Sequence, residues 1–207
     1  MSPTLVFVGT LVDMDDHPIG HYNRWTVDLA VQLINSAPEF GRAELLTEPA
    51  DVDALLAAQG ARSSRVATEH DVLALRSVRS RLAIAATTNR EQAAALLNDV
   101  AADAGATPRM TCHDGHDWHI DHHIPGDWPW RHIAAESAVG LMGLLLDDSR
   151  GRLRICEADD CHRLLADRTK NGSTRFCPGL GCANRERVRR YRARKSVDVE
   201  APSTTER

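Results

Sequence analysis

The sequence predicts an α+β protein in two parts: a mainly helical N-terminal domain with a β-hairpin, then a small cysteine-stapled hairpin-plus-helix module. Apolar residues recur at helical spacing in several segments before residue 149. The period changes to a strand-like pattern after Pro108. Four of the five cysteines fall in two close pairs near the C-terminus. We therefore expect domains at residues 1–150 and 151–195, with a disordered polar tail at 196–207.

Apolar spacing places the elements of the N-terminal domain. Helices are expected, in chain order, at residues 25–36, 51–59, 68–87, 88–105 and 131–148. A β-like run precedes them at residues 4–12. Two short strands are expected around Asp114–Gly115, a dipeptide that favours tight hairpin turns.

Two of these helices carry recognisable end signals. Thr68 and Asp71 resemble a capping box, and Thr88 with Glu91 has the same spacing. Gly105 is a natural C-cap, because glycine adopts the left-handed conformation at low cost. These signals predict where the third and fourth helices begin and where the fourth ends.

The predicted second strand of the hairpin is rich in histidine. Strand alternation puts His119, Asp121 and His123 on one face, where they could sense a ligand or bind a divalent metal. A polar strand face with no ligand is the favoured interpretation. No nucleophile–base pair or glycine-rich phosphate loop accompanies the hairpin, so we predict that the protein is not an enzyme. Cys112, a lone thiol, is expected in the core.

Charge divides the chain sharply. Residues 1–149 carry 10 Lys and Arg against 21 Asp and Glu, whereas residues 150–195 carry 14 against 5. This uneven charge distribution predicts that the C-terminal part binds a polyanion. No apolar run approaches the roughly 18 residues that cross a bilayer, and no signal peptide is evident, so a cytoplasmic location is expected.

The cysteine spacing is that of a metal site. The four cysteines follow C-x4-C-x15-C-x4-C, at Cys156, Cys161, Cys177 and Cys182. Paired thiols in a reducing compartment favour one tetrahedral Zn²⁺ over disulfides. Four thiolates close the coordination shell, so this zinc should be structural, and binding it should fold the module.

A basic helix is expected at or just after Cys182. One side of this helix carries Arg185, Arg189 and Arg192, and an adjacent side carries Arg187, Arg190 and Arg194. Val188 and Tyr191 form an apolar stripe, which is expected to pack on the zinc hairpin. Such a helix matches a nucleic-acid-binding element. The candidate DNA contacts are Asn184, Arg185, Arg187, Arg189, Arg190, Arg192, Arg194 and Lys195. A solvated basic face is the alternative.

The C-terminal segment resembles the CGNR zinc finger, with the four cysteines, Asn184 and Arg185 at the family positions. Ala183 replaces the motif glycine, and Phe176 supplies the usual aromatic. Upstream stretches such as "DLAVQLINS", "WHIDHH" and "AAESAVGLM" are similar to the ABATE domain that usually precedes this finger. The resemblance implies a stress-related transcriptional regulator whose finger binds DNA.

The leading functional hypothesis is therefore a zinc-finger DNA-binding transcriptional regulator whose N-terminal domain senses a ligand or partner. A single small finger buries limited area, so a homodimer or a partner such as RNA polymerase is plausible. Two alternatives remain: a zinc-stabilised protein-interaction module, and a small-molecule-binding protein or enzyme built on the N-terminal domain. RNA is less favoured, because Tyr191 is the only aromatic residue in the basic helix.

Overall fold

The computed structural model describes residues 20–41, 43–58, 63–112, 119–123, 126–146 and 149–200. Its N-terminal part contains the helices α1 (Gly20–Asn35), α2 (Pro49–Ala58), α3 (Glu69–Thr87), α4 (Arg90–Ala104) and α5 (Pro129–Leu146). Strands β1 (Thr107–Thr111) and β2 (His119–His123) pair antiparallel between α4 and α5. The C-terminal part comprises the short helix η1 (Ser149–Arg152), strands β3 (Leu153–Ile155) and β4 (Leu164–Ala166), and helix α6 (Cys182–Glu200). The predicted α+β class is confirmed.

Helix α5 is the centre of the helical part, because it contacts α1, α2, α3 and α4. The apolar stripes predicted from periodicity supply the core. On α1 the apolar residues at helical spacing are buried: Val27, Leu29, Ala30, Leu33 and Ile34. On α5 the buried side chains include Ile133, Ala134 and Leu141. No helix in the described part of the chain is long and apolar enough to cross a bilayer.

The crossing of α1 and α5 requires a glycine. A Cβ atom on Gly140 would lie 2.6 Å from the carbonyl carbon and Oγ1 of Thr26, and 2.7 Å from the amide nitrogen of Val27. Thr26 is itself fully buried. The two helix backbones are therefore closer than any larger residue permits.

Two of the three predicted helix-end signals are confirmed. Thr68 and Asp71 form the expected capping box, in which Asp71 Oδ2 accepts from the Thr68 amide at 2.9 Å. The box predicted at Thr88 is wrong, because Thr88 ends α3 and Asn89 caps α4 by accepting from the Gln92 amide at 2.9 Å. Gly105 is the left-handed C-cap that the sequence predicts.

Other boundaries differ by a few residues. Helix α5 begins at Pro129, two residues earlier than expected, since proline is well suited to the first turn. Helix α6 continues to Glu200, so residues 196–200, which were expected to belong to the disordered tail, are helical. The β-like run at residues 4–12, the Asp114–Gly115 turn and residues 201–207 lie outside the described residues.

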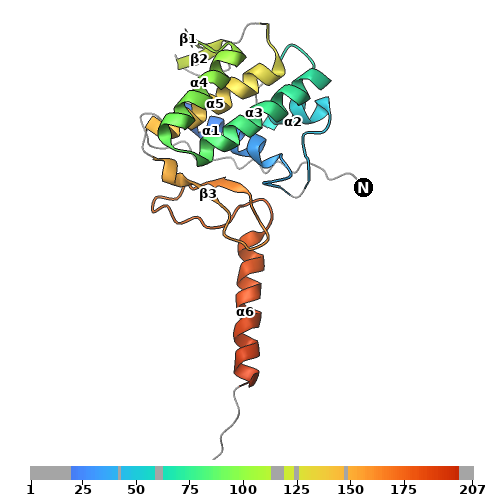
Figure 1. Ribbon diagram of the computed structural model, residues 1–207, viewed down its shortest axis with the longest axis vertical. Coiled ribbons are helices and arrows are strands. Elements are labelled where there is room, and N and C mark those ends of the chain that lie inside the picture. The colour runs from blue at the N-terminus through green and yellow to red at the C-terminus, as the bar shows by residue number, and fades with distance from the viewer. Residues whose placement is uncertain are drawn as a thin grey trace, which may run out of the picture.

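The C-terminal module is joined to the helical part by strand β4. Leu164 is 3% exposed and belongs to the main hydrophobic core, whereas its neighbour Leu165 belongs to the smaller core around the cysteines. The Asn35 side chain hydrogen-bonds the backbone of Leu164, and Arg168 forms an ion pair with Asp28 of α1. Figure 1 shows the module beneath the helical body, with α6 extending away from both.

Candidate metal centre

The first cysteine pair lies in the turn between β3 and β4. The Cys156 amide donates to the carbonyl oxygen of Arg163 at 2.8 Å, which closes the base of this turn. Inside it, the Cys161 amide donates to the Ala158 carbonyl oxygen at 3.0 Å. The short hairpin thus holds both thiols in one buried knuckle, with Cys156 4% and Cys161 5% exposed.

The second pair lies where the chain enters α6. Gly181 takes a φ of 62°, in the left-handed region that favours glycine, so the chain can turn sharply between Cys177 and Cys182. Cys182 is the first residue of α6, as predicted, and the amides of Asn184 and Arg185 bond the Gly181 carbonyl. One metal ligand therefore starts the helix itself.

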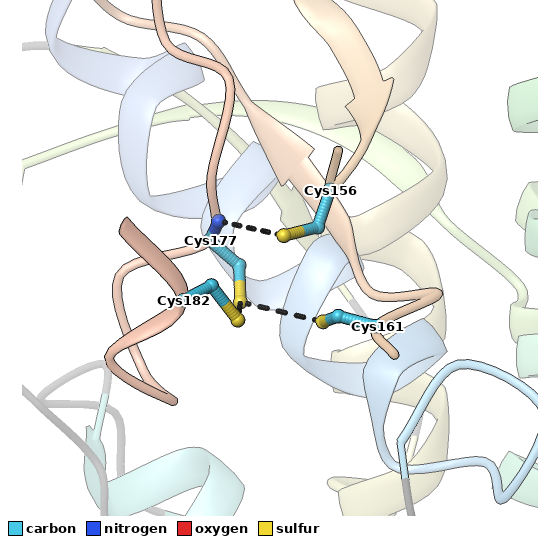
Figure 2. Close-up of side chains that lie close together, drawn as sticks. All are labelled: Cys156, Cys161, Cys177 and Cys182. Atoms are coloured by element: carbon cyan, nitrogen blue, oxygen red, sulfur yellow. Dashed lines mark hydrogen bonds between the residues drawn. The ribbon is translucent and has the colours of Figure 1, made fainter. Parts of the chain in front are cut away.

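The four sulfur atoms form a compact cluster (Figure 2). All four ligand atoms lie within 4.8 Å of one another, with Sγ–Sγ distances of 3.7 Å for Cys161–Cys177 and 3.5 Å for Cys177–Cys182. A tetrahedral zinc site with Zn–S bonds of about 2.3 Å has sulfur–sulfur edges of about 3.8 Å, whereas a disulfide bond is about 2.05 Å long. The geometry fits zinc and excludes disulfides among these cysteines.

The electrostatics of the four-cysteine cluster also favour a bound cation. Burial, together with the neighbouring Cys182 and Cys161 thiols, raises the pKa of Cys177 well above its ordinary value. For Cys156, burial is outweighed by hydrogen bonds from the Ala158 and Cys177 amides, which lower its pKa. Several thiolates at this separation repel one another, and a divalent cation removes that repulsion. The donor set is four sulfurs with no open position, which is typical of a structural zinc.

Arg185 braces the second cysteine pair. Its Nη2 lies 3.3 Å from Cys182 Sγ and 3.0 Å from Asp160 Oδ1, and its Nη1 donates to the Leu180 carbonyl oxygen. A donor to a ligating sulfur orients and stabilises that ligand. The acceptor Asp160 was not singled out from the sequence, because its contact with Arg185 exists only once the two knuckles meet.

Residues 152–195 match the family model of the CGNR zinc finger, and residues 27–145 match the ABATE model, described as a putative stress-induced transcription regulator. The chain belongs to the ABATE family. Its four buried cysteines are the zinc site of a CGNR finger, as the sequence predicts. A search of curated proteins found no match to this ABATE chain.

The basic helix of this ABATE protein differs from expectation in one respect. Val188 and Tyr191 were expected to be covered by the zinc hairpin, but they are 39% and 59% exposed. Neither residue belongs to the hydrophobic cluster of the finger in the described part of the chain, and α6 extends away from the finger (Figure 1). Phe176 fills the place instead by packing against the buried cysteines.

The structure locates the predicted nucleic-acid contacts along α6 but distributes them unevenly. Three are paired with carboxylates: Arg185 with Asp160, Arg189 with Asp159 and Glu186, and Arg190 with Glu186. Asn184 accepts from Arg187 at 2.6 Å. No described carboxylate pairs with Arg187, Arg192, Arg194 or Lys195, and these four residues are exposed.

The histidine-rich strand of the ABATE domain is β2. It carries His119, Asp121 and His123 at alternate positions, and their side chains lie outside the described part of the structure, so the sensing role stays a prediction. Between them, His122 faces α5, with Nδ1 3.8 Å from Oε1 of the buried Glu136. Cys112, expected in the core, is exposed.

Proposed function

We propose that this protein is a DNA-binding transcription regulator in which the zinc site holds α6 as the DNA-contacting element. The domains of the proposal are an ABATE regulatory domain at residues 1–150 and the finger at 151–195. Membership of a family of transcription regulators supports this reading, and so does the CGNR finger. A catalytic role is not part of the proposal.

One observation carries the proposal. Helix α6 is 19 residues long, begins at a zinc ligand and extends from the body with exposed arginines around it. Its diameter of about 10–12 Å, with side chains, fits the major groove of B-DNA, which is about 12 Å wide. A basic helix held at one end by a rigid metal knuckle is suited to phosphate contacts and base readout.

The charge distribution supports contact through the finger alone. The net charge is −11 for residues 1–149 and +9 for residues 150–195. A polyanion is repelled by the first part and attracted by the second. In this proposal the ABATE domain responds to a ligand or partner. A homodimer or RNA polymerase would add the contact area with DNA that one small finger lacks.

The test uses the full-length zinc-loaded protein. A random pool of duplex DNA is selected on the protein, and affinity for the enriched duplex is measured by fluorescence anisotropy. Between about 50 and 200 mM salt, log K should fall linearly with log salt, with a slope near −0.9 for each phosphate neutralised. Loss of binding on chelation, with recovery on added zinc, is also expected.

Two results would reject the function. One is no enrichment and no affinity for any duplex at low salt. The other is retained DNA binding after replacement of Cys177 and Cys182, because that would separate binding from the zinc-anchored helix. Binding to acidic protein surfaces with no preference for DNA would favour an interaction module instead.

A further inference from the structure

Helix α6 has two different basic sides. At about 100° per residue, Ala183, Arg187, Arg190 and Arg194 fall on one side. Arg185, Arg189 and Arg192 fall about 180° away, so the two arginine sets lie opposite each other and not on the adjacent sides that were expected. The two sides can therefore be compared residue by residue.

The side with Arg185 and Arg189 is largely neutralised. Arg185 is held by Asp160, and Arg189 is paired with Asp159 and with Glu186 at 2.8 Å. Asp159 and Asp160 remain 69% and 58% exposed. These carboxylates would repel phosphates that approach α6 from this side.

The opposite side lines a groove between α6 and the loop that precedes the second cysteine pair. The groove has a volume of about 620 Å³, and its lining residues are Phe176, Ala183, Glu186, Arg187, Arg190 and Arg194. Its three guanidinium groups lie near two carboxylates. Glu186 is 8% exposed and shared with Arg189, and Glu157, which interacts with Arg190, is itself paired with Arg175. The partner of Arg187 is the neutral Asn184. This side is therefore the strongly cationic one.

We propose that the groove face, formed by Phe176, Arg187, Arg190 and Arg194, is the side of α6 that contacts the phosphates of duplex DNA, with Asp159 and Asp160 turned away. The proposal rests on the proposed DNA-binding function and adds the orientation of the helix. Arg187 and Arg194 are two helical turns apart, about 10 Å along the axis, and so contact separate phosphates. Charge complementarity favours DNA as the occupant over a less densely charged protein surface.

The chain offers a matched control for this face. The double variant Arg187→Gln/Arg194→Gln removes two charges from the groove face, and Arg189→Gln/Arg192→Gln removes two from the opposite side. Both retain zinc ligands and core residues, so equal zinc content and equal helix content by circular dichroism are the folding check. Long-range attraction falls equally in both, because each loses two positive charges.

Duplex affinity of the full-length zinc-loaded protein is measured for both variants over a salt series. The groove-face variant should bind at least tenfold more weakly than the wild type, with a salt slope shallower by about 1.8, the value for two lost phosphate contacts. The opposite variant should change affinity less than threefold and leave the slope unchanged.

Three outcomes overturn the orientation. Equal losses in the two variants, or a larger loss in Arg189→Gln/Arg192→Gln, would refute it while leaving DNA binding intact. Concentration-dependent dimerisation of the wild type without DNA, abolished by Arg187→Gln/Arg194→Gln, would show that a second copy occupies the groove face. Absence of duplex binding by the wild type would remove the proposed function itself, which distinguishes the two failures.

Discussion

The side-chain amide of Asn35 pairs with the backbone of Leu164 as a neighbouring strand would: Nδ2 donates to the Leu164 carbonyl at 2.8 Å, and Oδ1 accepts from the Leu164 amide at 2.8 Å. The two residues are 129 positions apart, and both are buried. One side chain thus satisfies both backbone groups of a strand residue that lies in the core of the helical part. This contact attaches the finger to the ABATE domain.

Replacement of Asn35 by alanine should destabilise this joint. The variant leaves a buried N–H and a buried C=O at Leu164 without partners, at a cost of about 2–4 kcal/mol in unfolding free energy. Urea denaturation measures the loss, and hydrogen exchange at the Leu164 amide locates it. Asn98→Ala, at an exposed position of α4, is the control and should change stability by less than about 0.5 kcal/mol. Unchanged Leu164 exchange in Asn35→Ala would contradict the assignment.

Replacement of Cys161 by serine should abolish stoichiometric zinc binding. Three thiolates and a hydroxyl bind zinc far more weakly than four thiolates, and metal binding in so small a module supplies its folding energy. Metal analysis after dialysis against a mild chelator measures the loss, and limited proteolysis should cut first within the finger. Cys112→Ser is the matched control, because Cys112 is exposed and outside the cluster. Its zinc content should equal that of the wild type.

Arg185 should set how tightly zinc is held. Arg185→Gln removes the donor to Cys182 Sγ and the link to Asp160, and loss of such a partner typically lowers metal affinity 10- to 100-fold. Competition with a chromophoric chelator measures this change. Arg192→Gln removes a charge from the same helix at an exposed position and should leave zinc affinity within threefold. Equal affinities in the two variants would rule out a bracing role for Arg185.

Gly140 should tolerate no larger residue. An alanine Cβ there meets the backbone of Thr26 and Val27, which cannot rotate away, so α1 and α5 must separate. Overpacking of this kind costs about 1–3 kcal/mol, and thermal unfolding should show a lower midpoint for Gly140→Ala. Gly151→Ala is the control, since no atom lies within 4 Å of its added Cβ. A midpoint unchanged by Gly140→Ala would contradict the close crossing.

The ion pair between Glu44 and Arg79 should make stability depend on pH. Burial raises the pKa of Glu44, but hydrogen bonds from Arg79 and the Leu46 amide outweigh it and hold the pKa below its ordinary 4.5. The unfolded chain therefore takes up this proton more readily, so the stabilisation is complete at neutral pH. It is lost as the pH falls through the lowered pKa.

Glu44→Gln tests this dependence. At pH 7 the variant should lose about 3 kcal/mol, because Arg79, whose side chain is 8% exposed, then keeps an uncompensated charge. The difference from the wild type should shrink as the pH falls through the lowered pKa of Glu44, because its carboxyl group then becomes protonated in both states. Urea denaturation at several pH values measures it, with the exposed Glu48→Gln as control. A difference that is constant with pH would exclude the ion pair as its source.

Local patterns in the sequence predict most of the fold, and long-range contacts explain what they miss. The spacing of Leu29, Leu33 and Ile34 reveals a buried face because helical period alone decides it. The cysteine spacing predicts the zinc site for a similar reason, since ligands come in local pairs. No local pattern shows that Asn35 would bond Leu164, because that contact depends on how the two parts pack.

The misplaced features have related causes. Thr88 and Asn89 are both good caps, and the choice depends on where α3 ends. An amphipathic stripe predicts burial only if another element packs against it, and Val188 and Tyr191 remain 39% and 59% exposed. Asp159 and Asp160 decide which arginines of α6 are neutralised. These two carboxylates lie next to α6 only when the knuckle is folded, so the sequence alone does not reveal the pairs.

Helix α6 spans 19 residues, or about 28 Å, and its described contacts with the finger lie near the end that begins with Cys182. Geometry then magnifies any rotation at that end: a tilt of about 10° moves the far tip by about 5 Å, more than the 3.4 Å rise of one base pair. The position that the helix reaches along a duplex is therefore set by the stiffness of its base. In this chain four sulfurs, the contacts of Arg185 and one asparagine bonded to strand β4 contribute to that stiffness.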